Sequence, residues 1–254
     1  MKFFRSIRIR FIAEKKLSNY LVYAIGEIIL VVIGILIALA INNSHENRVV
    51  REKEQTYLVG LRNEFQISRL KLQELIKVNG QNYEGAKKIV QLIGNENAPL
   101  DEKEFSELLY QTFAADIAFN PNNSLLQEMI NTGRLKDISN NKLRIRLTNW
   151  ISAQEDISKQ EHELAVQREK VLDMFHREEY SIRTVFDLSG VSEEVMGLSR
   201  AHTHISNLGL LQSVAFENNI LLFMLTTHAT EVNHYLPLME DMDFILTLIN
   251  AEIK

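Results

Sequence analysis

The sequence of 254 residues contains no cysteine, three prolines and one tryptophan. The lack of cysteine excludes disulfide bonds, thiol catalysis and zinc sites built from cysteine ligands. After residue 41, no alternation of apolar and polar residues with a period of two persists for more than a few residues. The sequence also has no glycine-rich phosphate loop and no nucleophile-elbow motif. These absences predict an all-α protein that is not an enzyme and needs no cofactor.

Residues 20–41 form one apolar stretch that carries a single charge, Glu27. As a helix, a stretch of this length reaches about 33 Å, which is enough to cross a hydrocarbon core of about 30 Å. The stretch therefore predicts one transmembrane helix. A cleaved signal peptide is the alternative, because Ala38-Leu39-Ala40 resembles a cleavage site. The cationic leader, the spanning length and Glu27 favour a retained span.

The charge distribution around this stretch predicts its orientation. The first 20 residues hold six cations against one anion, Glu14, whereas residues 42–54 hold three of each sign. The positive-inside rule therefore predicts a cytoplasmic N-terminus. Apolar residues at near-helical spacing predict an interfacial amphipathic helix within the basic tail, residues 1–19, and an unstructured tail is the alternative. These apolar residues are Phe3, Phe4, Ile7, Phe11 and Ile12.

Residues 42–254 are then predicted to lie outside the cytoplasm as an elongated helical bundle that continues from the span. They carry 22 Lys and Arg against 31 Asp and Glu, a net charge of −9. Such an acidic domain is a poor binder of nucleic acid, because neutralising phosphates requires clustered cations. The first outer helix is predicted to end at Asn79-Gly80. A short helix to Gly94 and a capping box at Asp101 and Glu104 are expected to follow.

Three further segments complete the predicted bundle. A short helix should run from Ser124 to Gly133, and the longest outer helix from Ser139 or Asn140 to about residue 179. Residues 181–207 are predicted to be a loop with one helical turn near residues 191–198. A final helix over residues 210–253 should kink at Pro237.

Apolar residues at heptad spacing mark the predicted contact faces of the two longest helices. In the longest outer helix, polar residues fill three positions of the heptad seam, which should be half-buried or should meet a partner chain. The seam comprises Leu143, Leu147, Trp150, Gln154, Ile157, Glu161, Leu164, Arg168, Val171 and Phe175. The core face of the final helix is predicted to comprise Leu211, Leu221, Leu225, Val232, Met239, Met242, Leu246, Ile249 and Ile253.

Glu27, Gly34 and Ala38 are the predicted interface residues of the span. Gly34 and Ala38 form a small-xxx-small pair on the helix face of Glu27, and such pairs let two membrane helices approach closely. An ionisable group at membrane depth is costly and is usually functional. We therefore expect spans to associate through this face. The alternative is that Glu27 reaches interfacial water and that the small residues are incidental.

Histidines are the secondary candidates for chemistry. His202 and His204 flank Thr203, and His228, Glu231 and His234 follow at steps of three. Zinc accepts imidazole ligands. However, His228 and His234 are expected to face apart on a helix, so solvated or core histidines are the simpler interpretation and no metal site is predicted.

Residues 23–43 carry the pattern YAIGEIxLVVIGILIALxINN. A second pattern, of seven residues from Gly133 to Leu147, lies further along the chain. Together they resemble an uncharacterised family of single-span proteins, a domain of unknown function common in Bacteroidota. The resemblance implies a bacterial inner membrane with the helical domain in the periplasm, and it supplies no activity or cofactor. Ser44 and His45 depart from the Trp-Asn typical of that family. The second pattern is Gly133, Leu135, Ile138, Asn140, Leu143, Arg144 and Leu147.

Two functions remain open at this point. The first is a membrane-anchored, non-enzymatic scaffold or assembly protein that forms homo-oligomers through its span and its long outer helices. The alternative is a periplasmic ligand-sensing module that signals through a partner membrane or envelope protein, because the cytoplasmic tail of about 20 residues is too short for a signalling enzyme.

Overall fold

The computed structural model describes residues 17–93 and 101–254, and these ranges contain helices and no strand. The predicted all-α fold is therefore confirmed. The chain divides into two compact units, Met1–Thr56 and Tyr57–Lys254. The first helix, α2 (Leu17–Ile93), begins in the first unit and ends in the second.

In the first unit, α2 carries apolar side chains on all sides, and every position from residue 28 to residue 41 is exposed. By length and composition it is the one helix in the described ranges that could cross a membrane, and none of its most apolar window is buried. The amphipathic helix predicted within residues 1–19 falls almost entirely outside the described residues.

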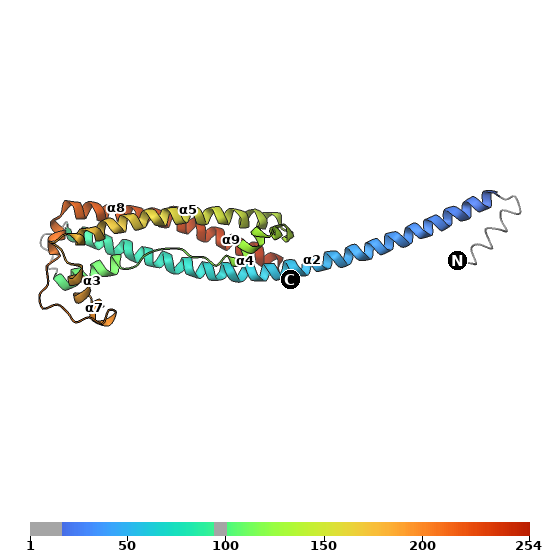
Figure 1. The fold of residues 1–254 in the computed structure, drawn as a ribbon. Coiled ribbons are helices and arrows are strands. Elements are labelled where there is room, and N and C mark those ends of the chain that lie inside the picture. The colour runs from blue at the N-terminus through green and yellow to red at the C-terminus, as the bar shows by residue number, and fades with distance from the viewer. Residues whose placement is uncertain (1–16, 94–100) are drawn as a thin grey trace. The chain divides into compact units, whose positions relative to one another are not determined.

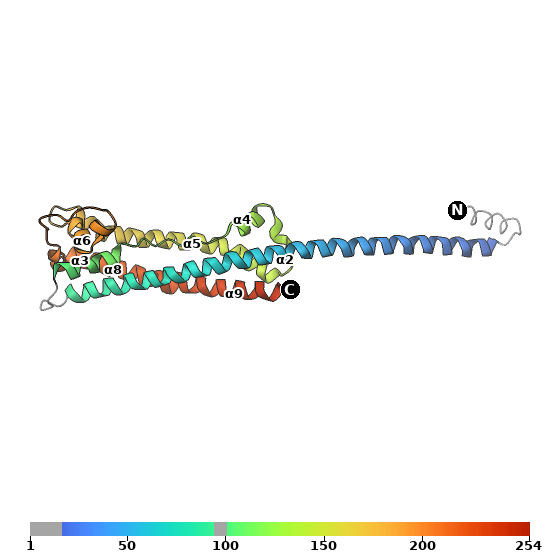
Figure 2. The ribbon, with the colours of Figure 1, turned by 90° about the horizontal axis from the view of Figure 1, so that it is seen from below.

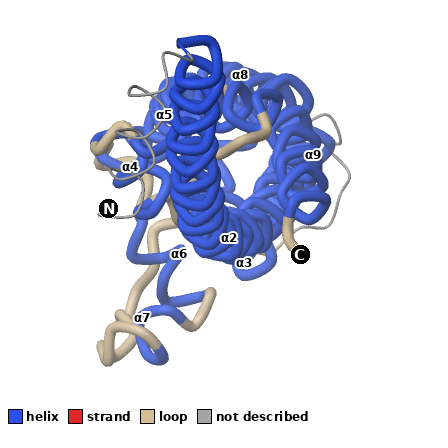
Figure 3. Tube along the Cα trace, turned by 90° about the vertical axis from the view of Figure 1, so that its right-hand side faces the viewer, coloured by secondary structure: helices blue, strands red, loops and turns tan. Residues whose placement is uncertain are grey.

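The second unit is an elongated bundle built around three long helical stretches, namely the end of α2, α5, and the run from α8 to α9 (Figures 1 and 2). Seen end-on, the second-unit part of α2 stands with α5, α8 and α9 around the core (Figure 3). In chain order, the elements after α2 are α3 (Glu102–Phe113), α4 (Ser124–Asn131), η1 (Arg134–Asp137), α5 (Asn141–Leu172), η2 (Asp173–His176), α6 (Ile182–Leu188), α7 (Val191–Glu194), η3 (Leu208–Gln212), α8 (Val214–Thr230), the π-helical segment η4 (Glu231–Tyr235) and α9 (Leu236–Glu252).

The predicted end of the first outer helix at Asn79-Gly80 is wrong, because α2 continues unbroken to Ile93. Asn79 is buried, and its Nδ2 donates to the Thr227 carbonyl at 3.1 Å and to Glu231 Oε2 at 3.2 Å. The amide thus joins α2 to the C-terminal helices instead of ending a helix.

The predicted helix starts are largely confirmed. Asp101 Oδ1 accepts from the Glu104 N–H at 2.7 Å, and Asn140 Oδ1 accepts from the Leu143 N–H at 3.0 Å. Both side chains satisfy backbone donors that a first helical turn leaves open. Helix α5 ends at Leu172, earlier than predicted, and is followed by the 3₁₀ turn η2.

The final helix runs without a break from Val214 to Glu252 but contains a π-helical segment, and its predicted core face is partly wrong. The π-helical segment directly precedes Leu236-Pro237 and inserts a step of five residues between the buried Thr230 and Tyr235. Because this step rotates one half of the helix against the other, Leu221, Leu225 and Val232 face solvent instead of the core. The buried face is Phe216, Ile220, Phe223, Thr227, Thr230, Tyr235, Leu238, Met242, Ile245, Leu246 and Ile249.

A small lobe, residues 177–207, lies beside α3 at one end of the second unit (Figures 1 and 2). It contains α7, which lies near the predicted helical turn. It also contains α6, which lies in a segment predicted to be a loop. Ser181 caps α6 by accepting from the Thr184 N–H at 3.2 Å.

Candidate functional site

The predicted span residues Glu27, Gly34 and Ala38 all lie on α2 in the first unit. Gly34 and Ala38 are one helical turn apart. A Cβ built on Gly34 would have no neighbour within 4 Å, so that side of the helix is open to close approach. The structure of one chain does not test a contact between two spans, which therefore stays a prediction.

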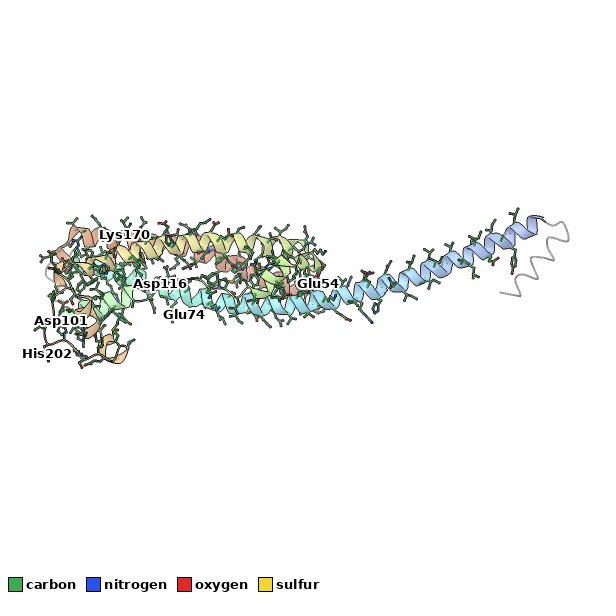
Figure 4. All side chains as sticks on the ribbon, in the orientation of Figure 1. Glu54, Glu74, Asp101, Asp116, Lys170 and His202 are labelled. Atoms are coloured by element: carbon green, nitrogen blue, oxygen red, sulfur yellow. The ribbon has the colours of Figure 1, made fainter. Side chains whose placement is uncertain are left out.

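The histidines do not form a cluster. His204 Nε2 lies 3.2 Å from Asp187 Oδ2, whereas His202 is exposed at the end of the unit that also holds Asp101 (Figure 4). His228 places its ring 5.8 Å from that of Tyr83 on α2. Across residues 17–93 and 101–254, no three His, Asp or Glu side chains are arranged to hold a metal ion.

Asp187 is the polar centre of the lobe and was missed by the sequence analysis. Its buried carboxylate accepts from Arg183 Nε at 2.7 Å and from the Ala201 N–H at 2.9 Å, in addition to its contact with His204. Burial alone would raise the pKa of Asp187. The nearby Ser192 hydroxyl and these partners outweigh burial and hold the pKa well below its usual range.

A second buried carboxylate, Glu161, lies in the seam of α5. Its Oε1 accepts from the Tyr235 hydroxyl at 2.7 Å and from the Phe119 N–H at 2.8 Å. Burial raises the pKa of Glu161, with a smaller contribution from Asp116, and the two hydrogen bonds only partly offset this rise. Burial and the adjacent Glu161 raise the pKa of the Tyr235 phenol. The pair fastens α5 to the π-helical segment.

The heptad seam of α5 is enclosed by its own chain, so a partner chain is not needed to cover it. Five of its apolar residues from Leu143 to Leu164 and also Val171 are buried. Its polar members have partners as well. Gln154 Oε1 accepts from Asn123 Nδ2 at 2.9 Å, and Arg168 donates to the Phe113 carbonyl at 2.7 Å.

A seam of the same spacing on the outer face of α8 is exposed to solvent, although the His228 ring within it lies beside Tyr83 of α2. Six exposed residues follow one another at steps of 4, 3, 4, 3 and 4, which is the spacing of one coiled-coil seam. Four are apolar, with exposed fractions from 44% for Leu221 to 69% for Val214. We call this set the α8 seam: Val214, Asn218, Leu221, Leu225, His228 and Val232.

The surroundings of the α8 seam carry little charge. Between residues 214 and 237, no exposed position holds Asp, Glu, Lys or Arg, and Glu217 and Glu231 are half-buried. Isolated apolar residues are common on surfaces, but a continuous uncharged stripe typically marks an interaction site. The flanking residues are Ala215, Leu222 and Ala229 on one side and Glu217, Met224 and Glu231 on the other.

An apolar pocket of about 420 Å³ lies between the lobe and the long helices. Helices α3 and α5 with η2 form one wall, and α6 and α7 form the other. Twelve of its fourteen lining residues are aliphatic or aromatic, and the other two are Arg168 and His176. We call it the lobe pocket.

The sequence contains a signal for one of these two sites. The spacing from Val214 to Val232 is visible in the chain, but the inner face of α8 has the same spacing. An apolar face was therefore predicted on this helix, and the wrong face was assigned to the core. The lobe pocket has no comparable signal, because its walls combine residues 109–114 with residues 168–196, which are far apart in the sequence.

Comparison with known proteins gives a family without a function. No curated protein and no solved structure matches the chain. A family model described as a family of unknown function, DUF6090, matches residues 27–158, which include most of α2 and the first half of α5. The chain therefore belongs to the DUF6090 family.

Proposed function

We propose that this protein is a membrane-anchored, non-enzymatic scaffold that assembles as a homo-oligomer, with the α8 seam as its main contact. The supporting observation is an exposed, uncharged heptad seam on a helix whose opposite face is fully buried. A surface helix that needs only one apolar face normally carries polar residues on the other. The second apolar face of α8 thus calls for a second partner.

A second copy of the chain fits this seam because the seam is complementary to itself. Its apolar and polar residues alternate in the order Val, Asn, Leu, Leu, His, Val, which has the same pattern in both directions. In a parallel pair Asn218 faces Asn218, and in an antiparallel pair it faces His228. In both cases apolar residues meet apolar residues, and each buried amide meets a polar partner, a device that fixes register in coiled coils.

The parallel order is favoured for copies tethered to one bilayer by the same N-terminal segment. The seam spans about 27 Å, which is short for an independent coiled coil. Fully burying an exposed leucine or valine contributes roughly 1.5–3 kcal/mol, whereas association costs 4–15 kcal/mol or more. Confinement to a membrane lowers that cost by raising the effective concentration.

The membrane topology is part of the same proposal. The cationic tail supports a cytoplasmic N-terminus, with the acidic second unit in the periplasm of a bacterial inner membrane. Glu27, Gly34 and Ala38 supply a second contact within the bilayer, where the open surface at Gly34 allows two helices to approach closely.

The test is the mass of the full chain extracted in mild detergent or held in nanodiscs. The wild type is expected to be a dimer or a higher oligomer, and Leu225→Glu should shift it towards monomer by placing two like charges at the centre of the seam. The matched control is Ile145→Glu, which changes an exposed apolar residue on α5, 53% exposed against 67% for Leu225. A monomeric wild type would contradict the proposal. An equal loss of the oligomer in both variants would contradict it as well.

The lobe pocket favours a second candidate function, a ligand-sensing module that passes its signal to a partner membrane protein. Preformed apolar pockets with a few polar groups are typical small-molecule sites. This candidate predicts that a ligand in the lobe pocket changes cross-linking to a neighbouring protein. The scaffold function requires no ligand.

A further inference from the structure

The lobe pocket is held open by its surroundings. Glu102 on α3 accepts from the Asn207 N–H at 2.8 Å and from the Ser206 hydroxyl at 2.5 Å. Asp187 on α6 accepts from Arg183 of the same helix and from the Ala201 N–H, and the second bond fastens α6 to the following loop. These polar contacts position the lobe, and the two walls also meet through Tyr110 on α3 and Phe186 on α6, whose ring centroids lie 6.5 Å apart.

The pocket leaves apolar surface uncovered at its edge. Val195 is 73% exposed and Met196 is 47% exposed, and both line the pocket. An apolar cavity is poorly hydrated and leaves the atoms of its walls without partners. An apolar occupant therefore gains contacts that water does not supply.

Arg168 gives the pocket its positive charge, and it also lines a small adjoining cavity together with Asp116. In the described part of the chain, its guanidinium forms no ion pair and donates to two backbone carbonyls at the end of α3, Phe113 at 2.7 Å and Ala114 at 3.4 Å. No Asp or Glu lines the pocket. His176 differs, because its ring lies 3.5 Å from Asp173. A guanidinium with donors to spare beside an apolar wall recognises an anionic group attached to an apolar body.

We propose that the lobe pocket binds a free long-chain carboxylic acid, with the hydrocarbon chain between α3 and α6 and the carboxylate at Arg168. The apolar lining suits an unbranched chain, and the guanidinium distinguishes an acid from a neutral hydrocarbon. This assignment deepens the sensing function and rests on the pocket being a ligand site. It does not depend on the α8 seam.

The experiment is photolabelling of the full chain in detergent with three probes that carry the same diazirine chain. The probes are palmitic acid, its methyl ester and phosphatidylglycerol. In the wild type, the acid should label peptides from α3 and α6 about tenfold more strongly than the ester does. That is the fold-change expected for one charge-assisted hydrogen bond.

Two variants with a control complete the design. Arg168→Gln should reduce labelling by the acid to the level of the ester and leave the ester unchanged, with helicity checked by circular dichroism. Ala114→Trp, which fills the pocket from its wall, should abolish labelling of this site by both probes. The control Ala118→Trp, at an exposed alanine outside the pocket, should change neither.

Three results would overturn the proposal in different ways. Equal labelling by acid and ester would show that Arg168 does not recognise the carboxylate, so the ligand would not be a free acid. The pocket would still be a ligand site. Stronger labelling by phosphatidylglycerol than by the free acid would show that the occupant is a phospholipid. Site labelling that persists in Ala114→Trp shows that the pocket is not occupied, and the sensing function then falls as well. If Arg168→Gln does not fold, the wild-type ratio of acid to ester still decides.

Discussion

The inner seam of α5 and the outer seam of α8 have the same heptad spacing but different surroundings. Both interrupt apolar residues with polar ones, Gln154, Glu161 and Arg168 in α5 and Asn218 and His228 in α8. The α5 seam is enclosed by its own bundle, whereas the α8 seam is open. Spacing thus identifies a contact face and does not say whether the contact lies within the chain or between chains.

The largest expected difference comes from removing matched leucines from the two seams. Leu164→Ala should lower the free energy of unfolding by about 2–5 kcal/mol, because it leaves a cavity in the core. Leu225→Ala should change the stability of the isolated fold by less than about 0.5 kcal/mol, because the side chain is exposed. Denaturant unfolding measured at low protein concentration separates the two. Similar losses for both variants would mean that the seams do not differ as described.

Two aspartates in and near the lobe extend the comparison to charged groups. Asp187→Asn should cost roughly 3 kcal/mol, because the enclosed carboxylate holds Arg183 and a backbone N–H. Asp173→Asn should cost almost nothing, since its pair with His176 is highly exposed. Thermal unfolding of both variants at pH 7 gives the measurement.

The pH dependence of Asp187 has a defined sign. Its pKa is lowered on folding, so its contribution is fully present above its ordinary pKa of 3.8 and is lost as pH falls towards the folded value. The stability difference between the wild type and Asp187→Asn should therefore shrink below about pH 4. A difference that grows on acidification would contradict the description of this site.

Glu161 tests the enclosed polar positions of the α5 seam. Tyr235→Phe removes one of two donors to the buried carboxylate and should cost about 1–3 kcal/mol. Glu161→Gln keeps an oxygen that accepts both bonds, so it should change stability by no more than about 1 kcal/mol at pH 7. Because the pKa of Glu161 is raised on folding, the wild type should lose stability as pH rises through 4.5 towards the folded pKa. Glu161→Gln should lack that loss. A larger loss of stability in Glu161→Gln than in Tyr235→Phe would contradict this description of Glu161.

Two glycines within α2 give the last comparison. A Cβ on Gly85 would collide with Thr112 of α3, whereas a Cβ on Gly80 would make only an ordinary contact with Glu231, at 3.9 Å. Gly85→Ala should therefore destabilise the fold by about 1–3 kcal/mol. Gly80→Ala should stabilise it by about 0.5–1 kcal/mol, because alanine favours a helix interior. Destabilisation by Gly80→Ala would indicate that the helix breaks there after all.

The sequence was sufficient for the elements that depend on local chemistry. The caps at Asp101 and Asn140 follow from side chains next to the amides that they satisfy, and the α5 seam follows from spacing. The sequence was not sufficient where distant residues decide. Asn79-Gly80 has the composition of a helix end, but its amide bonds Thr227 and Glu231, 148 and 152 residues away. The π-helical segment likewise holds Tyr235, whose hydroxyl donates to Glu161, 74 residues away.

The most direct test of the central claim uses the absence of cysteine, since one introduced thiol is then unique in the chain. Leu225→Cys, expressed in full-length protein and oxidised in native membranes, should give a disulfide-linked dimer, because the parallel α8 seam places this position opposite its copy. Ile145→Cys, exposed on α5, should stay monomeric under the same conditions. Failure of Leu225→Cys to cross-link, or equal cross-linking at both positions, would contradict assembly through the α8 seam.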